Sequence, residues 1–269
     1  MSQDGRRHEI TLRKVVYRAP GMEAATVRRD EAYRAEDGEQ LALDVYYPPD
    51  SKSGARPGAV VFVIGFPDRG AQLRLGCRAK EMESYVCWAR LVAASGMAGV
   101  TYSTGGDPAA DVHALLRHVR ANAASLRVDG DRIALWACSG HVPTALRALM
   151  QEPVKCAALW YGYMLDLGGS TAMADAARTF GFRNAAAGKS VTDLPRDTPL
   201  FVVRAGRDEM PGLNEAIDRF TATALAGNLP LTLVNQAAAP HAFDIMDDSE
   251  RSREVIRQGL SFLRFHLSA

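Results

Sequence analysis

The strongest constraint on the fold is a series of short apolar runs separated by helical patterns. The run at residues 60–64, Val-Val-Phe-Val-Ile, is continuously apolar and rich in β-branched side chains. Such a run is typical of a strand that is buried on both faces, as in a parallel sheet. Five further runs of this type follow, at residues 97–102, 133–137, 157–161, 200–203 and 231–234.

Helical stripes of apolar residues lie between most of these runs and predict βαβ units. The second of the four clearest stripes begins with Asp107-Pro108, a capping residue followed by a proline at the first helical position. Strands that alternate with helices favour right-handed crossovers, so we expect an α/β fold with a mainly parallel central sheet flanked by helices. The four stripes cover residues 85–95, 112–119, 213–224 and 256–267.

The predicted elements divide the chain into an N-terminal extension at residues 1–27 and one domain at residues 28–269. Within the extension, residues 15–17 are a candidate edge strand. Residues 162–197 interrupt the alternation and are rich in Ala, Gly and Thr. Because a structureless loop of that length is unusual in a compact domain, we expect a small inserted cap with one or two short helices. The domain itself would begin with strands at residues 26–33 and 41–47.

The charge balance and the hydropathy pattern exclude several classes of partner. Lys and Arg number 32 against 31 Asp and Glu, so the net charge of +1 provides no basic field for nucleic acid or an anionic membrane. No stretch approaches the ~20 apolar residues that cross a bilayer, and residues 1–10 lack the apolar core of a secretory signal. We therefore expect a cytoplasmic protein. A homodimer is expected only because such dimers are common among soluble proteins.

The four cysteines match no zinc or redox spacing, so we expect free thiols and no metal site. They are Cys77, Cys87, Cys138 and Cys156.

The segment around Ser139 carries the first chemical signal. A predicted strand runs directly into a predicted helix through Ala137-Cys138-Ser139-Gly140-His141. This segment resembles the nucleophile elbow of the α/β-hydrolase superfamily, whose usual form is G-x-S-x-G. A strained turn of small residues lets strand and helix approach closely while the serine hydroxyl stays exposed. Ala137 is a mild departure from that pattern and His141 a larger one, so His141 must point away from the strand.

Two later segments supply the partners that such a serine needs. Asp208 follows the predicted strand at residues 200–203, and His241 follows the one at 231–234. The order Ser, Asp, His is that of the superfamily, and each residue lies just past the carboxyl end of a parallel strand. His241 would take the proton of the Ser139 hydroxyl during attack, and Asp208 would hold the correct imidazole tautomer.

The sequence offers rival residues for each position. Cys138 as the nucleophile would shift the elbow by one residue and place Trp136 where a small side chain is needed. Glu209 and Asp166 are alternatives to Asp208. His141 is more consistent with shaping the pocket than with acting as a base, because it lies on the same turn as the serine.

Aromatic residues after the strand at 157–161 are candidates for the pocket lining, with core packing as the equal alternative. They are Trp160, Tyr161 and Tyr163, and Cys138 and His141 join them as pocket candidates.

The resemblance extends over about residues 40–267 and implies further features. An oxyanion would bind the backbone N–H groups of Gly140 and Phe66; Pro67 has no N–H, and Ile64-Gly65 stands where the family often has His-Gly. The segments Pro-His-Ala-Phe-Asp at 240–244 and Gly-Arg-Asp at 206–208 are most similar to the dienelactone-hydrolase and small-esterase branch.

That branch implies hydrolysis of a small-molecule carboxylic ester or lactone through an acyl-enzyme, without a metal or organic cofactor. Acyl transfer or peptidase-like cleavage by the same three residues is a second interpretation. A non-catalytic binding protein on a hydrolase scaffold is a third, because His141 and Ile64 depart from the family pattern.

Overall fold

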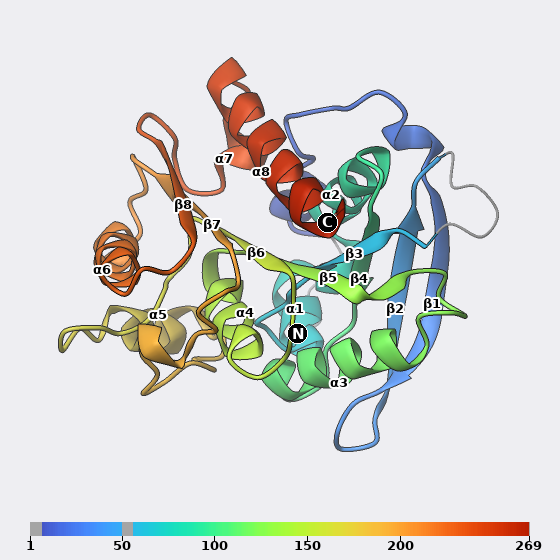
Figure 1. The fold of residues 1–269 in the computed structure, drawn as a ribbon, viewed down its shortest axis with the longest axis horizontal. Coiled ribbons are helices and arrows are strands. Elements are labelled where there is room, and N and C mark those ends of the chain that lie inside the picture. The colour runs from blue at the N-terminus through green and yellow to red at the C-terminus, as the bar shows by residue number, and fades with distance from the viewer. Residues whose placement is uncertain (1–6, 50–55, 269) are drawn as a thin grey trace, which may run out of the picture.

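The computed structural model describes residues 7–49 and 56–268 and shows one eight-stranded sheet in the order β1-β2-β4-β3-β5-β6-β7-β8 (Figure 1). The pairs β1/β2 and β2/β4 are antiparallel, and all other neighbours are parallel. The predicted α/β architecture is thereby confirmed. The strands are β1 (Thr26–Arg34), β2 (Gln40–Tyr47), β3 (Gly58–Phe62), β4 (Ala98–Tyr102), β5 (Asp129–Cys138), β6 (Cys156–Trp160), β7 (Leu200–Ala205) and β8 (Leu231–Gln236).

Eight α-helices lie within the described residues: α1 (Asp68–Leu75), α2 (Glu83–Ala94), α3 (Pro108–Ala121), α4 (Val142–Leu149), α5 (Ala172–Phe180), α6 (Leu213–Ala226), α7 (Phe243–Met246) and α8 (Glu250–Ser268). Helices α2 and α8 cover one side of the sheet, and α3, α4 and α6 cover the other (Figure 1). The same part of the chain contains five short 3-10 turns: η1 (Glu9–Leu12), η2 (Met22–Ala24), η3 (Ala79–Glu81), η4 (Ser139–His141) and η5 (Val191–Asp193).

Continuous apolar runs form the central strands for the predicted reason. Every residue of β3, β4 and β6 is buried, as a strand covered by helices on both faces requires. At the start of α3 the Asp107 side chain accepts a hydrogen bond from the N–H of Ala109, which confirms the predicted cap.

A cluster of tryptophan rings lies in the core beneath α2 and α8. The rings of Trp88 and Trp136 lie 5.0 Å apart, and those of Trp88 and Trp160 lie 5.2 Å apart. Gly259 lets α8 approach this cluster, since a Cβ atom there would lie 2.6 Å from the Trp160 ring. Trp160 is therefore a core residue.

Two regions differ from the prediction or refine it. Residues 15–17 form no strand; the N–H of Val16 instead donates to the carbonyl of Asp244, which ties this segment to α7. The chain between Trp160 and Leu200 contains α5 and η5. None of the helices in the described part of the chain combines the length and apolar character needed to cross a bilayer.

Candidate active site

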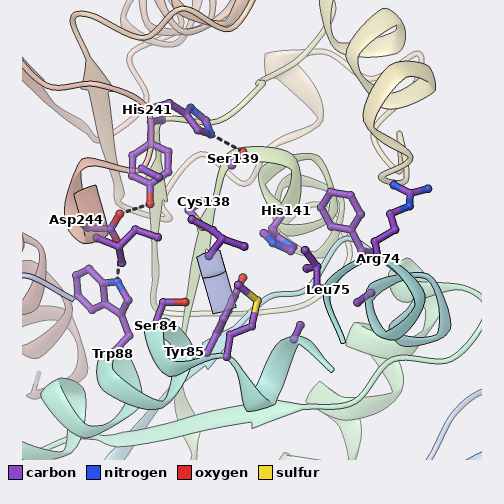
Figure 2. A pocket seen from close by; sticks show the side chains of 18 of the residues that line it. Arg74, Leu75, Ser84, Tyr85, Trp88, Cys138, Ser139, His141, His241 and Asp244 are labelled. Atoms are coloured by element: carbon purple, nitrogen blue, oxygen red, sulfur yellow. Dashed lines mark hydrogen bonds between the residues drawn. The ribbon is translucent and has the colours of Figure 1, made fainter. Parts of the chain in front are cut away.

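Ser139, Asp208 and His241 lie at the carboxyl edge of the sheet and form one hydrogen-bonded series. Ser139 directly follows β5, Asp208 follows β7, and His241 lies in the loop after β8. The Oγ atom of Ser139 is 2.9 Å from Nε2 of His241 (Figure 2), and Nδ1 of His241 is 2.6 Å from Oδ2 of Asp208. This arrangement can pass a proton from the hydroxyl to the imidazole while the carboxylate holds the ring.

The turn at Ser139 is strained, as the elbow pattern predicts. Ser139 has a φ angle of 50°, in the left-handed region that non-glycine residues seldom adopt. Its carbonyl packs against Gly162, where a Cβ atom would lie 2.8 Å from that oxygen and 2.2 Å from Cγ2 of Val142. The small residue that allows this close packing is thus supplied by the chain after β6, outside the elbow itself.

The structure distinguishes Asp208 from its two rivals. Its side chain is fully buried, and Oδ1 accepts a hydrogen bond from the N–H of Met210 at 3.0 Å. Glu209 is exposed. Asp166 caps α5 instead, because its two carboxylate oxygens accept backbone N–H groups at the start of that helix. Of the three carboxylates, only Asp208 contacts His241.

His141 points away from β5, toward the loop that follows β3. Its Nδ1 atom accepts a hydrogen bond from the N–H of Gly65 at 2.7 Å, so in the neutral ring the proton lies on Nε2. Burial lowers the pKa of His141 to about 4, which keeps the ring neutral near pH 7. The imidazole therefore joins the elbow to the β3 loop and is separate from the Ser139–His241 pair.

The two candidate oxyanion donors come from these joined loops. A Cβ atom on Gly65 would lie 2.8 Å from the carbonyl oxygen of Gly140, and one on Gly140 would lie 3.1 Å from the Phe66 ring. The N–H of Arg183 donates to the Gly65 carbonyl at 3.0 Å and holds the Gly65–Phe66 peptide, which carries the Phe66 N–H. The structure thus brings Phe66 and Gly140 together beside Ser139, and their N–H groups remain the candidate oxyanion donors.

A cavity of about 410 Å³ opens beside Ser139 (Figure 2). Of the five predicted pocket residues, Cys138, His141 and Tyr161 line it. The other two, Trp160 and Tyr163, do not: Trp160 packs in the core, and Tyr163 stacks on Phe182 and donates to a backbone carbonyl. Sequence patterns missed other lining residues, among them Ile10, Arg74, Tyr85, Trp88 and Asp244.

Cys138 lies in this cavity wall but is a poor candidate nucleophile. Burial raises the pKa of its thiol, which disfavours the reactive thiolate. The residue still belongs to β5, before the strained turn. All four cysteines are free.

A buried tyrosine–aspartate pair lies next to His241. The Tyr161 hydroxyl donates to Oδ1 of Asp244 at 2.5 Å, and Nε1 of Trp88 donates to Oδ2 at 2.7 Å (Figure 2). Asp244 is 2% exposed, and desolvation raises its pKa. The Tyr161 ring packs edge-on against the His241 imidazole with centroids 5.2 Å apart, and its φ of 33° is strained for an aromatic residue.

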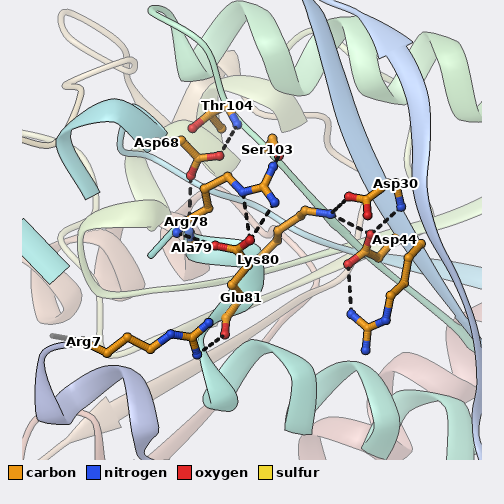
Figure 3. Close-up of polar contacts among 11 residues, drawn as sticks. Arg7, Asp30, Asp44, Asp68, Arg78, Ala79, Lys80, Glu81, Ser103 and Thr104 are labelled. Atoms are coloured by element: carbon orange, nitrogen blue, oxygen red, sulfur yellow. Dashed lines mark hydrogen bonds and ion pairs between the residues drawn. The ribbon is translucent and has the colours of Figure 1, made fainter. Parts of the chain in front are cut away.

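A polar network holds η3, which contributes to the cavity wall, in place (Figure 3). The buried Lys80 ammonium binds Asp44 at 2.7 Å and Asp30 at 2.8 Å, which ties η3 to strand β2 and the middle of β1. Asp68 accepts the N–H groups of Ala79 and Thr104, so it joins α1, η3 and the loop after β4. Since Ala79 lines the cavity, these contacts hold its wall in place. Among the described residues, no cluster of three or more His, Cys, Asp or Glu side chains could hold a metal ion.

Comparison with solved structures identifies the architecture. A mutant of the esterase rPPE superimposes with a TM-score of 0.70 at 14% identity, over 91% of this chain and 84% of that one. LAE6, an alpha/beta hydrolase enzyme from the metagenome of Lake Arreo, gives a TM-score of 0.66 at 16% identity, over 93% and 87%. The chain has the α/β-hydrolase fold.

An esterase from Pyrobaculum calidifontis matches this α/β-hydrolase fold with a TM-score of 0.67 at 19% identity, over 91% of this chain and 87% of that one. No protein-family model and no curated protein sequence matches the chain. The dienelactone-hydrolase branch stays a prediction.

Proposed function

We propose that the protein is a serine hydrolase that cleaves carboxylic esters or lactones through an acyl-enzyme on Ser139. The observation that carries this proposal is the hydrogen-bonded series Ser139–His241–Asp208 on a strained elbow. The esterase names of the similar structures support the same reaction class.

In the proposed reaction, the Ser139 oxygen attacks the ester carbonyl carbon while His241 Nε2 takes the hydroxyl proton. The carbonyl oxygen becomes an oxyanion that the N–H groups of Phe66 and Gly140 stabilise. When the tetrahedral intermediate collapses, the carbon–alkoxy bond breaks, and His241 gives its proton to the leaving alcohol. Asp208 holds the imidazole ring, and its carboxylate stabilises the imidazolium.

A water molecule then hydrolyses the acyl-enzyme. His241 takes a proton from the water molecule as its oxygen attacks the acyl carbon, and the bond to Ser139 breaks when that proton returns to the serine oxygen. The carboxylic acid leaves, and the enzyme is restored without any external electron donor or acceptor.

Steady-state hydrolysis of p-nitrophenyl acetate by the wild type and by Ser139→Ala tests the proposal. The variant should lose at least about 10³-fold in kcat while its circular dichroism spectrum is unchanged. Ser84→Ala is the matched control, because Ser84 is a second buried serine in the wall of the same cavity. Equal turnover by Ser139→Ala and the wild type would refute the proposal.

A further inference from the structure

The N-terminal segment closes one side of the cavity beside Ser139. Ile10, in η1, is part of the cavity wall. The segment is tied down on both sides of this position: the N–H of His8 donates to the Leu75 carbonyl at 2.9 Å, and the N–H of Val16 donates to the Asp244 carbonyl at 2.8 Å. Thr11 is fully buried between these anchors. Residues far from the elbow in sequence therefore help to define the space beside the nucleophile.

Most of the wall is apolar. It contains the aromatic side chains of Phe66, Tyr85, Trp88 and Trp136 and the aliphatic side chains of Leu75 in α1 and Ile245 in α7. These groups offer mainly apolar contact area. Nε1 of Trp88 is already bonded to Asp244, and the Tyr85 hydroxyl and Trp136 Nε1, which have no hydrogen-bond partner among the described residues, are almost inaccessible.

The charged groups of the wall are already engaged within the protein. Arg74 donates to the carbonyl of Phe180 at 2.8 Å, at the carboxyl end of α5, where the helix dipole favours a cation. The Asp244 carboxylate receives the hydrogen bonds of Tyr161 and Trp88. Arg74 is exposed and bonds a neutral carbonyl, whereas Asp244 is a buried carboxylate beside the aromatic part of the wall. A charged substituent beside the aromatic rings would lose its hydration, and an anion there would also lie near the Asp244 carboxylate.

We propose that this cavity binds an uncharged, apolar substituent of the ester, and that Ile10 limits the size of that substituent. The inference rests on the proposed function, because it describes what lies beside the bond that Ser139 attacks.

The size limit is tested with two substrate series, p-nitrophenyl esters from acetate to octanoate and acetates of alcohols from ethanol to octanol. Ile10→Trp should lower kcat/KM at least about tenfold for the longest member of one series. The kcat/KM values for p-nitrophenyl acetate and ethyl acetate should change less than about twofold. Leu12→Trp is the matched control, since Leu12 lies on the same turn but is 54% exposed. Equal loss at all lengths in both series, or the same loss in the control, would overturn the assignment of Ile10.

The charge preference is tested with p-nitrophenyl pentanoate against p-nitrophenyl hemisuccinate, which adds a carboxylate at similar length. Pentanoate should be preferred at least about 100-fold in kcat/KM. Equal or faster turnover of the hemisuccinate would refute the apolar assignment. Calorimetric binding of octyl acetate to Ser139→Ala, with and without Ile10→Trp, separates the cavity assignment from the proposed hydrolase activity. Weaker binding to the double variant supports the cavity assignment even if the wild type cleaves no ester. Equal binding to the two variants contradicts the cavity assignment.

Discussion

The N–H of Gly65 donates a 2.7 Å hydrogen bond to Nδ1 of His141, and this contact joins the two loops that carry the candidate oxyanion donors. His141 occupies the position where the elbow pattern has its second glycine. The larger side chain is accommodated because it turns away from β5 and satisfies a backbone donor of the β3 loop. His141, although it departs from the elbow pattern, therefore links the elbow to the loop after β3.

His141 should make the fold sensitive to acid. Its pKa is about 4 in the folded protein and near 6.5 in an unfolded chain, so between these values the unfolded state binds a proton that the folded state does not. The contribution of His141 to the free energy of unfolding is therefore lost as the pH falls from about 6.5 to about 4, by a total on the order of 3 kcal/mol.

Urea unfolding at pH 7.5 and pH 4.5 checks this expectation. His141→Gln, which keeps a side-chain acceptor, should lose less free energy of unfolding between the two pH values than the wild type. Ser139→Ala retains the imidazole and should behave as the wild type does. Identical acid sensitivity in His141→Gln and the wild type would contradict the assignment.

Removal of the Asp208 charge should disable the base without unfolding the protein. Asp208→Asn keeps the size of the side chain but favours the wrong tautomer of His241, and kcat should fall about 10³- to 10⁴-fold. Glu209→Gln, one residue along and exposed, is the control and should stay within about twofold of the wild type. Similar losses in the two variants would show that the carboxylate was misassigned.

Gly162 should be intolerant of a side chain. A Cβ atom would lie 2.2 Å from Val142 and 2.8 Å from the Ser139 carbonyl, so Gly162→Ala must displace the elbow. We expect a loss of about 1–3 kcal/mol in stability together with reduced turnover. Gly106→Ala, where the added atom meets open space, is the control. Thermal melts and ester assays of the two variants decide the matter, and full activity of Gly162→Ala would contradict the packing described.

Tyr161→Phe should expose the energetic role of the buried Asp244. The variant removes a hydroxyl donor from a carboxylate that is 2% exposed, which should reduce the free energy of unfolding by about 1–3 kcal/mol. Tyr163→Phe is the matched control: its hydroxyl donates to the neutral carbonyl of Pro211, so a smaller loss is expected. Chemical denaturation compares them, and a larger loss in the control would count against a charged Asp244.

The sheet could be predicted because its signal is local. Apolar runs such as residues 60–64 are typical of strands covered on both faces, and β3 is such a strand, whereas the run at residues 231–234 forms the partly exposed edge strand β8. Strand order along the chain places Ser139, Asp208 and His241 at one edge. Helix α1 was missed because its sequence, Asp-Arg-Gly-Ala-Gln-Leu-Arg-Leu, has no apolar stripe.

The cavity wall could not be predicted in the same way, because it depends on contacts between distant segments. Val16 was expected in a strand, yet its N–H bonds to the carbonyl of Asp244. Trp160 and Tyr161 are adjacent in sequence, but only Tyr161 reaches the cavity, since the chain leaves β6 through a strained turn at that residue. Neither outcome follows from composition or periodicity.

An activated Ser139 hydroxyl should react covalently with a fluorophosphonate, and intact-mass and peptide analysis of the treated protein measures that reaction. We expect a single adduct on Ser139 in the folded wild type, with none on Ser139→Ala and slower formation on His241→Gln. A folded wild type that stays unlabelled, or equal labelling of Ser139→Ala, would contradict this expectation.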